Sequence, residues 1–169
     1  MPSAVTTILL MGALMVAPAY SWTHEEVAAF CANIELHSCD AGEYRLNDHS
    51  CVKFLPSQMT FHEAQEGCEL VGGAVVELAS HEEHRKLVCI AFAAVPFRFH
   101  YWMGAKRGPD AFEWIHKGKP LETVPWREGQ PDNFNGNEDC VWINSGSWGP
   151  FNDGPCSEFS SVVCQIPKS

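Results

Sequence analysis

The eight cysteines of this 169-residue chain constrain its folding more than any other feature. They occupy positions 31, 39, 51, 68, 89, 140, 156 and 164, all downstream of an apolar N-terminal run. An even number of cysteines behind such a run is typical of a domain that folds in an oxidising compartment and is stapled by disulfides. Eight cysteines allow on the order of a hundred pairings, so their spacing alone does not decide which pairs form.

The N-terminal run has the composition of a secretory signal peptide. It covers residues 4 to 19 and ends in the small-residue pattern Ala17-Pro18-Ala19, which predicts cleavage before Tyr20. A membrane-spanning helix needs about 20 apolar residues, more than this run supplies, so we expect no membrane insertion. Residues 1–19 are therefore predicted to be a signal peptide, and the mature protein to be secreted to the extracellular space.

The rest of the chain has the composition of a globular protein, with 46% hydrophobic and 19% charged residues overall. Residues 20–38 are predicted to be an N-terminal extension with a short amphipathic helix over Glu25–Phe30. Residues 39–169 show no internal repeat or linker, which predicts one domain. The net charge of −10 argues against nucleic acid and anionic membranes as partners.

The C-terminal third concentrates side chains that end in carboxylate or amide oxygens. The candidate ligands among them span 24 residues: Gln130, Asp132, Glu138, Asn152 and Asp153. Ca²⁺ binds roughly six to eight oxygens and accepts carboxylates mixed with neutral carbonyls, so the set predicts a site for one Ca²⁺ with positions left open. A cis peptide before Pro131 would turn Gln130 and Asp132 toward the same ion, whereas the alternative is an ordinary polar turn.

The spacing of these residues resembles that of the C-type lectin domain family. The matching residues are Gln130-Pro131-Asp132, Glu138-Asp139-Cys140, and Asn152-Asp153 followed by Cys156, with Phe151 in place of the family's usual Trp. The resemblance covers the chain from Cys39 onward, and it implies that the five oxygen-bearing residues are ligands of the family's sugar-binding calcium. It also implies an α+β fold of the C-type lectin-like kind. In that fold two helices pack on small antiparallel sheets, with long calcium-binding loops, here over residues 116–139.

The local sequence patterns fit this fold class. Thr60 with Glu63 and Ser80 with Glu83 are capping boxes, which predict one helix through about Leu70 and another through Cys89 toward Phe92. Residues 72–78 are predicted to form a turn and a short strand. The other predicted strands are Tyr44–Leu46, Ser50–Phe54, Tyr101–Gly104, Phe112–Ile115, Cys140–Ile143 and Ser161–Gln165.

The resemblance also implies a disulfide pattern. The implied pairs are Cys39 with Cys51, Cys68 with Cys164, and Cys140 with Cys156. Cys31 and Cys89 lie outside the family's usual pattern. They either pair with each other, which would pin the extension to the second helix, or one of them bridges to another chain and makes a homodimer.

The order of amide and acid in Gln130-Pro131-Asp132 implies the sugar. A carboxylate only accepts hydrogen bonds, whereas Gln also donates them, and in the family this order favours glycans with terminal galactose or N-acetylgalactosamine. Gln130, Asp132, Glu138 and Asn152 would contact the sugar hydroxyls. Phe134 stands where galactose-binding relatives place a stacking Trp; it either forms that platform or covers the loop.

The sequence argues against several other functions. Many relatives hold a second calcium, but Arg107 and Asn133 replace two of its ligands and leave Asp139 alone, so we expect no second site. His81 and His84 lack the spacing of a zinc hydrolase and are interpreted as surface histidines. No nucleophile motif suggests an enzyme. The alternative to a lectin is another use of the same fold, namely ice binding as in type II antifreeze proteins, or binding to a protein or mineral surface.

Overall fold

The computed structural model describes residues 23–94, 100–121, 124–143 and 149–168. The signal peptide prediction lies outside these residues, and the extension is described from Thr23 onward. In the described part the helices are α1 (His24–Cys31), α2 (Phe61–Leu70) and α3 (His81–Ala94), with a 3₁₀ turn η1 (Phe134–Gly136). None of these helices has the length and apolar character needed to cross a membrane.

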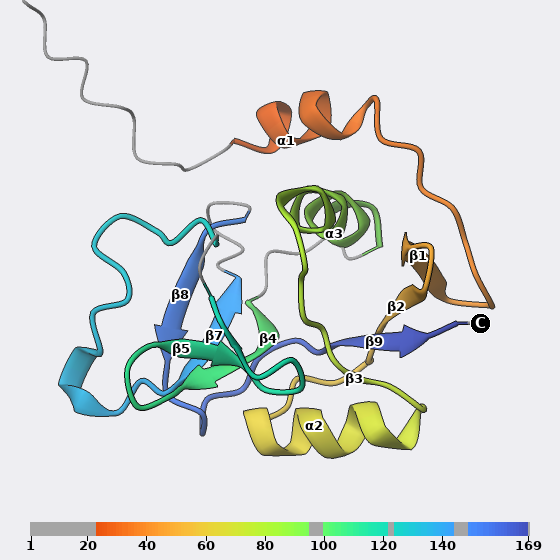
Figure 1. The fold of residues 1–169 in the computed structure, drawn as a ribbon. Coiled ribbons are helices and arrows are strands. Elements are labelled where there is room, and N and C mark those ends of the chain that lie inside the picture. Colours follow the sequence, from red (N-terminus) through yellow and green to blue (C-terminus); the bar gives the residue numbers. More distant parts are fainter. Residues whose placement is uncertain (1–22, 95–99, 122–123, 144–148, 169) are drawn as a thin grey trace, which may run out of the picture.

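Nine strands form two antiparallel sheets in the described ranges. The first has the order β1-β2-β9-β3, with β1 Glu43–Asn47, β2 Ser50–Phe54, β9 Val163–Pro167 and β3 Ala74–Val75. The second has the order β6-β5-β4-β7-β8, with β6 Lys119–Pro120, β5 Phe112–Trp114, β4 Tyr101–Arg107, β7 Cys140–Ile143 and β8 Phe151–Gly154. Strands β3 and β9 lie between α2 and α3, the second sheet lies to their left, and α1 lies on the outer side of α3 (Figure 1). The α+β architecture expected from the sequence is confirmed.

The start of α3 shows how a local signal is used for a longer-range contact. The Ser80 hydroxyl accepts the Glu83 amide at 3.1 Å, as the capping box predicts. The Glu83 carboxylate, however, accepts the amide of Ala79 at 2.6 Å and the side-chain amide of Asn47 at 2.7 Å. One glutamate therefore caps α3 and ties it to the turn between β1 and β2.

Two strands, β6 and β8, were not expected. β6 is a two-residue exposed pair, and β8 carries Asn152, Asp153 and Gly154, which are poor strand formers. The short strand expected after the turn within residues 72–78 is β3; beyond it the Val76 amide still bonds the Val163 carbonyl at 3.0 Å, and the Glu77 amide bonds the Gln165 side chain at 3.2 Å. β8 owes its place to the register with β7, in which Asp153 faces Val141.

The core has two main parts and a small third cluster in which Val27 of α1 meets Val88 of α3. Between α3 and the sheets, Ile90 and Phe151 belong to one cluster of buried residues. Beneath α2, Phe61 meets Trp102 edge-on with ring centroids 5.4 Å apart. Burial of these side chains is the main stabilising term for a domain of this size. The second cluster also holds Cys140, so it lies directly under the segment that leads into β7.

Four disulfides staple this core. The three implied pairs, Cys39–Cys51, Cys68–Cys164 and Cys140–Cys156, are confirmed, and Cys31 pairs with Cys89, as the intramolecular alternative predicted. The Cys31–Cys89 disulfide joins α1 to α3, where Val27 is fully buried and the Arg85 guanidinium lies 4.6 Å from the centre of the Phe30 ring. Because all eight cysteines are paired within the chain, the alternative of a covalent homodimer through Cys31 or Cys89 is wrong.

Candidate metal site

Strand β8 supplies one half of the candidate site. Asp153 has no solvent-exposed surface, and its carboxylate accepts three hydrogen bonds. The Asp132 amide donates to one oxygen at 3.1 Å, while the Asn133 amide and the Arg107 guanidinium donate to the other at 2.9 Å each. Hydrogen bonds to a charged acceptor are stronger than neutral ones, so Asp153 fixes the start of the loop that follows Pro131.

The loop supplies the other half. The Gln130-Pro131 peptide is cis, and Asn133 has a φ of 48°, a left-handed conformation that asparagine tolerates better than most residues. The Asn133 side chain accepts the Glu138 amide at 3.1 Å, and the Phe134 amide donates to the Glu138 carboxylate at 2.8 Å. These contacts curl the loop through η1, so that Glu138 returns to the neighbourhood of Asp132.

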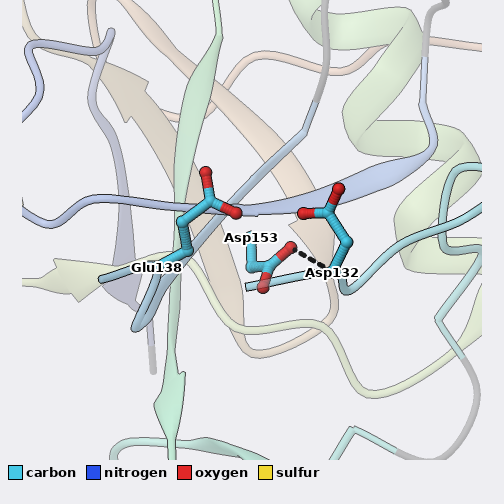
Figure 2. Close-up of side chains that lie close together, drawn as sticks. All are labelled: Asp132, Glu138 and Asp153. Carbon is cyan, nitrogen blue, oxygen red and sulfur yellow. Dashed lines mark hydrogen bonds between the residues drawn. The ribbon is translucent and has the colours of Figure 1, made fainter. Parts of the chain in front are cut away.

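The two halves bring three carboxylates together. Oxygens of Asp132, Glu138 and Asp153 lie within 4.8 Å of one another. Figure 2 shows Asp132 and Glu138 on either side of Asp153. Burial raises the pKa of Glu138 above its ordinary value, and the charges of Asp153 and Asp132 raise it further. Carboxylates this close repel one another, and a bound cation relieves that repulsion.

The predicted ligand set also contains two side-chain amides, those of Gln130 and Asn152. Gln130 Oε1 is buried and has no hydrogen-bond partner, which is costly for a carbonyl oxygen unless something else coordinates it. The Asn152 side-chain amide contacts the Asp153 carbonyl, so these two polar groups lie side by side on β8. Three carboxylates with an unpartnered amide oxygen form a hard oxygen donor set of the kind that suits Ca²⁺ better than Zn²⁺.

Arg107, at the end of β4, is one of the two residues that led us to expect no second calcium. Its guanidinium donates to Asp139 Oδ1 at 3.1 Å, to the Glu138 carbonyl at 2.8 Å and to Asp153 Oδ2 at 2.9 Å. From the sequence, Arg107 was noted only because it replaces a ligand of the second calcium found in many relatives. Its contact with Asp153 joins residues 46 positions apart, which no local pattern reveals.

The two remaining predicted residues differ in exposure. Phe134, in η1, has 66% of its surface exposed, so its side chain leaves most of its area accessible to a ligand. His84 is half-buried, less exposed than predicted: its Nε2 donates to the Gly149 carbonyl at 2.7 Å, and its ring packs edge-on against Phe151 at 5.5 Å. Burial lowers the pKa of His84, whereas His81 on the same helix is exposed.

Comparison with known proteins places this geometry in a family. Residues 57–166 match the family model for the lectin C-type domain. The C-type isolectin Sp-CL4 of Scorpaena plumieri is 35% identical over 136 residues, which make up 79% of this chain and 92% of that protein. The family-model match runs from α2 through the second sheet and the loop with Gln130 into β9, so the candidate site lies in the shared region.

Solved structures confirm the C-type lectin-like fold. The mouse scavenger receptor C-type lectin carbohydrate-recognition domain aligns with a TM-score of 0.65 and 25% identity, covering 78% of this chain and 98% of that one. The herring type II antifreeze protein aligns with a TM-score of 0.65 and 24% identity, covering 78% of this chain and all of that one. The second likeness shows the fold alone. The two structures together show that one fold occurs both in a carbohydrate-recognition domain and in an antifreeze protein.

Proposed function

The chain belongs to the C-type lectin domain family, and we propose that it is a secreted, calcium-dependent lectin for glycans with terminal galactose or N-acetylgalactosamine. One observation carries the proposal: the carboxylates of Asp132, Glu138 and Asp153 converge within 4.8 Å, and Gln130 adds a buried oxygen that has no partner. A cation held by this set would keep open positions for a ligand, because the protein supplies fewer oxygens than Ca²⁺ accepts.

The residues that would hold the ion are Gln130, Asp132, Glu138, Asn152 and Asp153. Calcium, when bound, supplies direct coordination of two neighbouring sugar hydroxyls. The flanking side chains then orient the sugar: the carboxylates of Asp132 and Glu138 accept hydrogen bonds from its hydroxyls, and the amides of Gln130 and Asn152 donate to them. Asp153, being fully buried, cannot touch a sugar and serves the ion and the loop only.

The preference for galactose rests on the order of donor and acceptor around the ion. Gln130 stands on one side of Pro131 and Asp132 on the other, so one flank donates and the other only accepts. Exchanging the two groups would reverse that polarity. Galactose also presents an apolar face of C–H groups, and Phe134, with 66% of its surface exposed, provides an aromatic ring close by in sequence for that face.

The experiment is affinity chromatography of the full chain, secreted from expressing cells, on galactose and mannose resins in calcium. We expect retention on galactose and elution with a chelator. The double variant Gln130→Glu with Asp132→Asn exchanges the two groups and is expected to move retention to mannose. Asp110→Asn, an exposed acid outside the ligand set, is the matched control and should behave as wild type.

Retention on neither resin would contradict the lectin proposal and favour the non-sugar uses of the fold. The structural likeness to the herring antifreeze protein makes ice binding the specific alternative, and faceted ice crystals grown in the presence of the protein would support it. Binding to a protein or mineral surface would instead survive the loss of Gln130 and Asp132. Single-site sugar affinity is expected to be weak, so strong retention would come from several sites acting together.

A further inference from the structure

We propose that Arg107 is a positioning residue: its guanidinium holds Asp153 and the Glu138–Asp139 backbone in place without a metal ion. The inference rests on the proposed function only in treating Asp153 and Glu138 as calcium ligands. The observation behind it is that one side chain contacts both halves of the candidate site. It bonds Asp153 on β8, and at the end of the loop it bonds the Glu138 carbonyl and the Asp139 carboxylate.

Arg107 is itself firmly held. It is the last residue of β4, and its amide donates to the Asp139 carbonyl at 2.8 Å, which fixes the backbone of the two segments against each other. The guanidinium carbon lies 4.4 Å from the centre of the Phe112 ring, a distance suited to a cation–π contact. The side chain is 31% exposed, so most of its surface is covered by these neighbours.

The chemistry of the guanidinium matches this task. Arginine stays protonated throughout the pH range in which proteins fold, and its planar fork presents several donors in fixed directions. Here Nη2 serves Asp153 and the Glu138 carbonyl, while Nε serves Asp139. A lysine ammonium could neutralise charge but could not satisfy three acceptors in this geometry. The positive charge also offsets repulsion among the acids gathered here.

The hydrogen bonds then transmit this anchoring to the loop. Asp153, fixed by Arg107, accepts the amides of Asp132 and Asn133, and Asn133 in turn accepts the Glu138 amide. Losing the guanidinium would leave a fully buried carboxylate with only two backbone donors, which favours local opening of the loop. Calcium would then have to order the loop as well as bind, and its apparent affinity would fall accordingly.

The test is amide hydrogen exchange of Asp132 and Asn133, measured by NMR in chelator and again in calcium. Wild-type protein is expected to protect both amides in chelator, because Asp153 is already fixed. Arg107→Ala is expected to exchange at these two amides at least about tenfold faster in chelator, and to regain protection when calcium is added. The backbone amide of Val141 in β7 reports global folding, and its exchange should accelerate less than that of the two loop amides.

The matched control is Arg127→Ala, which removes an exposed arginine close to Gln130 in sequence and is expected to leave all of these rates unchanged. Wild-type protection of Asp132 and Asn133 in chelated Arg107→Ala would overturn the proposal. If that variant does not fold, Arg107→Lys decides: faster exchange at both amides supports the guanidinium role, and unchanged exchange contradicts it. The chelator measurement involves neither sugar nor calcium, so its failure is separate from a failure of the lectin proposal.

Discussion

Two carboxylates of the candidate site, Asp153 and Asp132, face the same space but belong to regions that are built differently. Asp153 lies on β8, is fully buried, and accepts hydrogen bonds from two backbone amides and a guanidinium. Asp132 lies on an exposed loop, where its backbone amide bonds Asp153. The strand half of the site, with Asp153, is therefore part of the folded core. The loop half, with Asp132, is attached to it by hydrogen bonds.

Two carboxylates proposed to bind the same ion can therefore differ in how much they stabilise the fold. A buried carboxylate that satisfies several donors contributes to folding as well as to metal binding, because removing it leaves those donors unpaired. An exposed carboxylate contributes to metal binding alone. Substitutions in the two halves should therefore separate stability from calcium affinity.

Replacing Asp153 by Asn should have the largest effect. The substitution removes the buried carboxylate that pairs with Arg107, leaves the guanidinium with the exposed Asp139, and places an amide N–H₂ near backbone donors. We expect loss of about 3 kcal/mol in the free energy of unfolding, together with loss of calcium binding. Denaturant unfolding in chelator measures the first and calorimetry the second. Unchanged stability in chelator would mean that the strand half is no more structural than the loop half.

The next largest effect is expected for Gly154→Ala, which perturbs β8 but changes none of the proposed calcium ligands. A Cβ added at Gly154 would lie 2.4 Å from the nearest atom of the Trp142 ring, so Gly154→Ala forces that ring or β8 to move. We expect a loss of about 2 kcal/mol in unfolding free energy, the usual cost of overpacking. An unfolding free energy that Gly154→Ala leaves unchanged would show that close packing against Trp142 is not what holds β8.

Replacing Asp132 by Asn should affect the loop half alone. The backbone amide that bonds Asp153 remains, so the unfolding free energy in chelator should stay within about 0.5 kcal/mol of wild type. Loss of one anionic ligand should weaken calcium binding at least about tenfold. A large drop in stability without calcium would contradict the division between the halves.

The smallest effect concerns pH. Ca²⁺ needs ionised carboxylates, and the pKa of Glu138 is raised by burial and by its acidic neighbours. Protons therefore compete with calcium at a higher pH than they would for an ordinary glutamate, and calcium affinity should fall steadily as the pH is lowered. In chelator the sign is opposite: a raised native pKa means that protonation of Glu138 favours the folded state, so its contribution to stability is lost as the pH rises. Calcium affinity unchanged at about pH 4.5 would contradict the ligand assignment.

The sequence predicted the parts of the fold that depend on local chemistry. The capping residues Thr60 and Ser80 placed the starts of α2 and α3 because side-chain capping is a local interaction. The resemblance supplied the disulfide pattern, which spacing alone could not. β8 was missed because its stability comes from pairing with β7 and from the packing of Phe151, and not from strand propensity.

The candidate site was predicted as a set of residues but not as a structure. Asp153 was expected to be a ligand, yet its role in holding the loop depends on backbone donors that any residue would carry. Arg107 was noticed for the ligand it replaces, whereas its contact with Asp153 depends on where β4 and β8 lie in the sheet. His84 was taken for a surface residue because nothing near it in sequence shows that Gly149 and Phe151 pack over it.

The most direct measurement is a calorimetric titration of Ca²⁺ into the metal-free protein, with Asp132→Asn titrated in parallel. The ligand set of Gln130, Asp132, Glu138, Asn152 and Asp153 predicts one ion per chain and much weaker binding in the variant. No calcium binding, or binding that Asp132→Asn leaves unchanged, would show that the convergent carboxylates are not a calcium site.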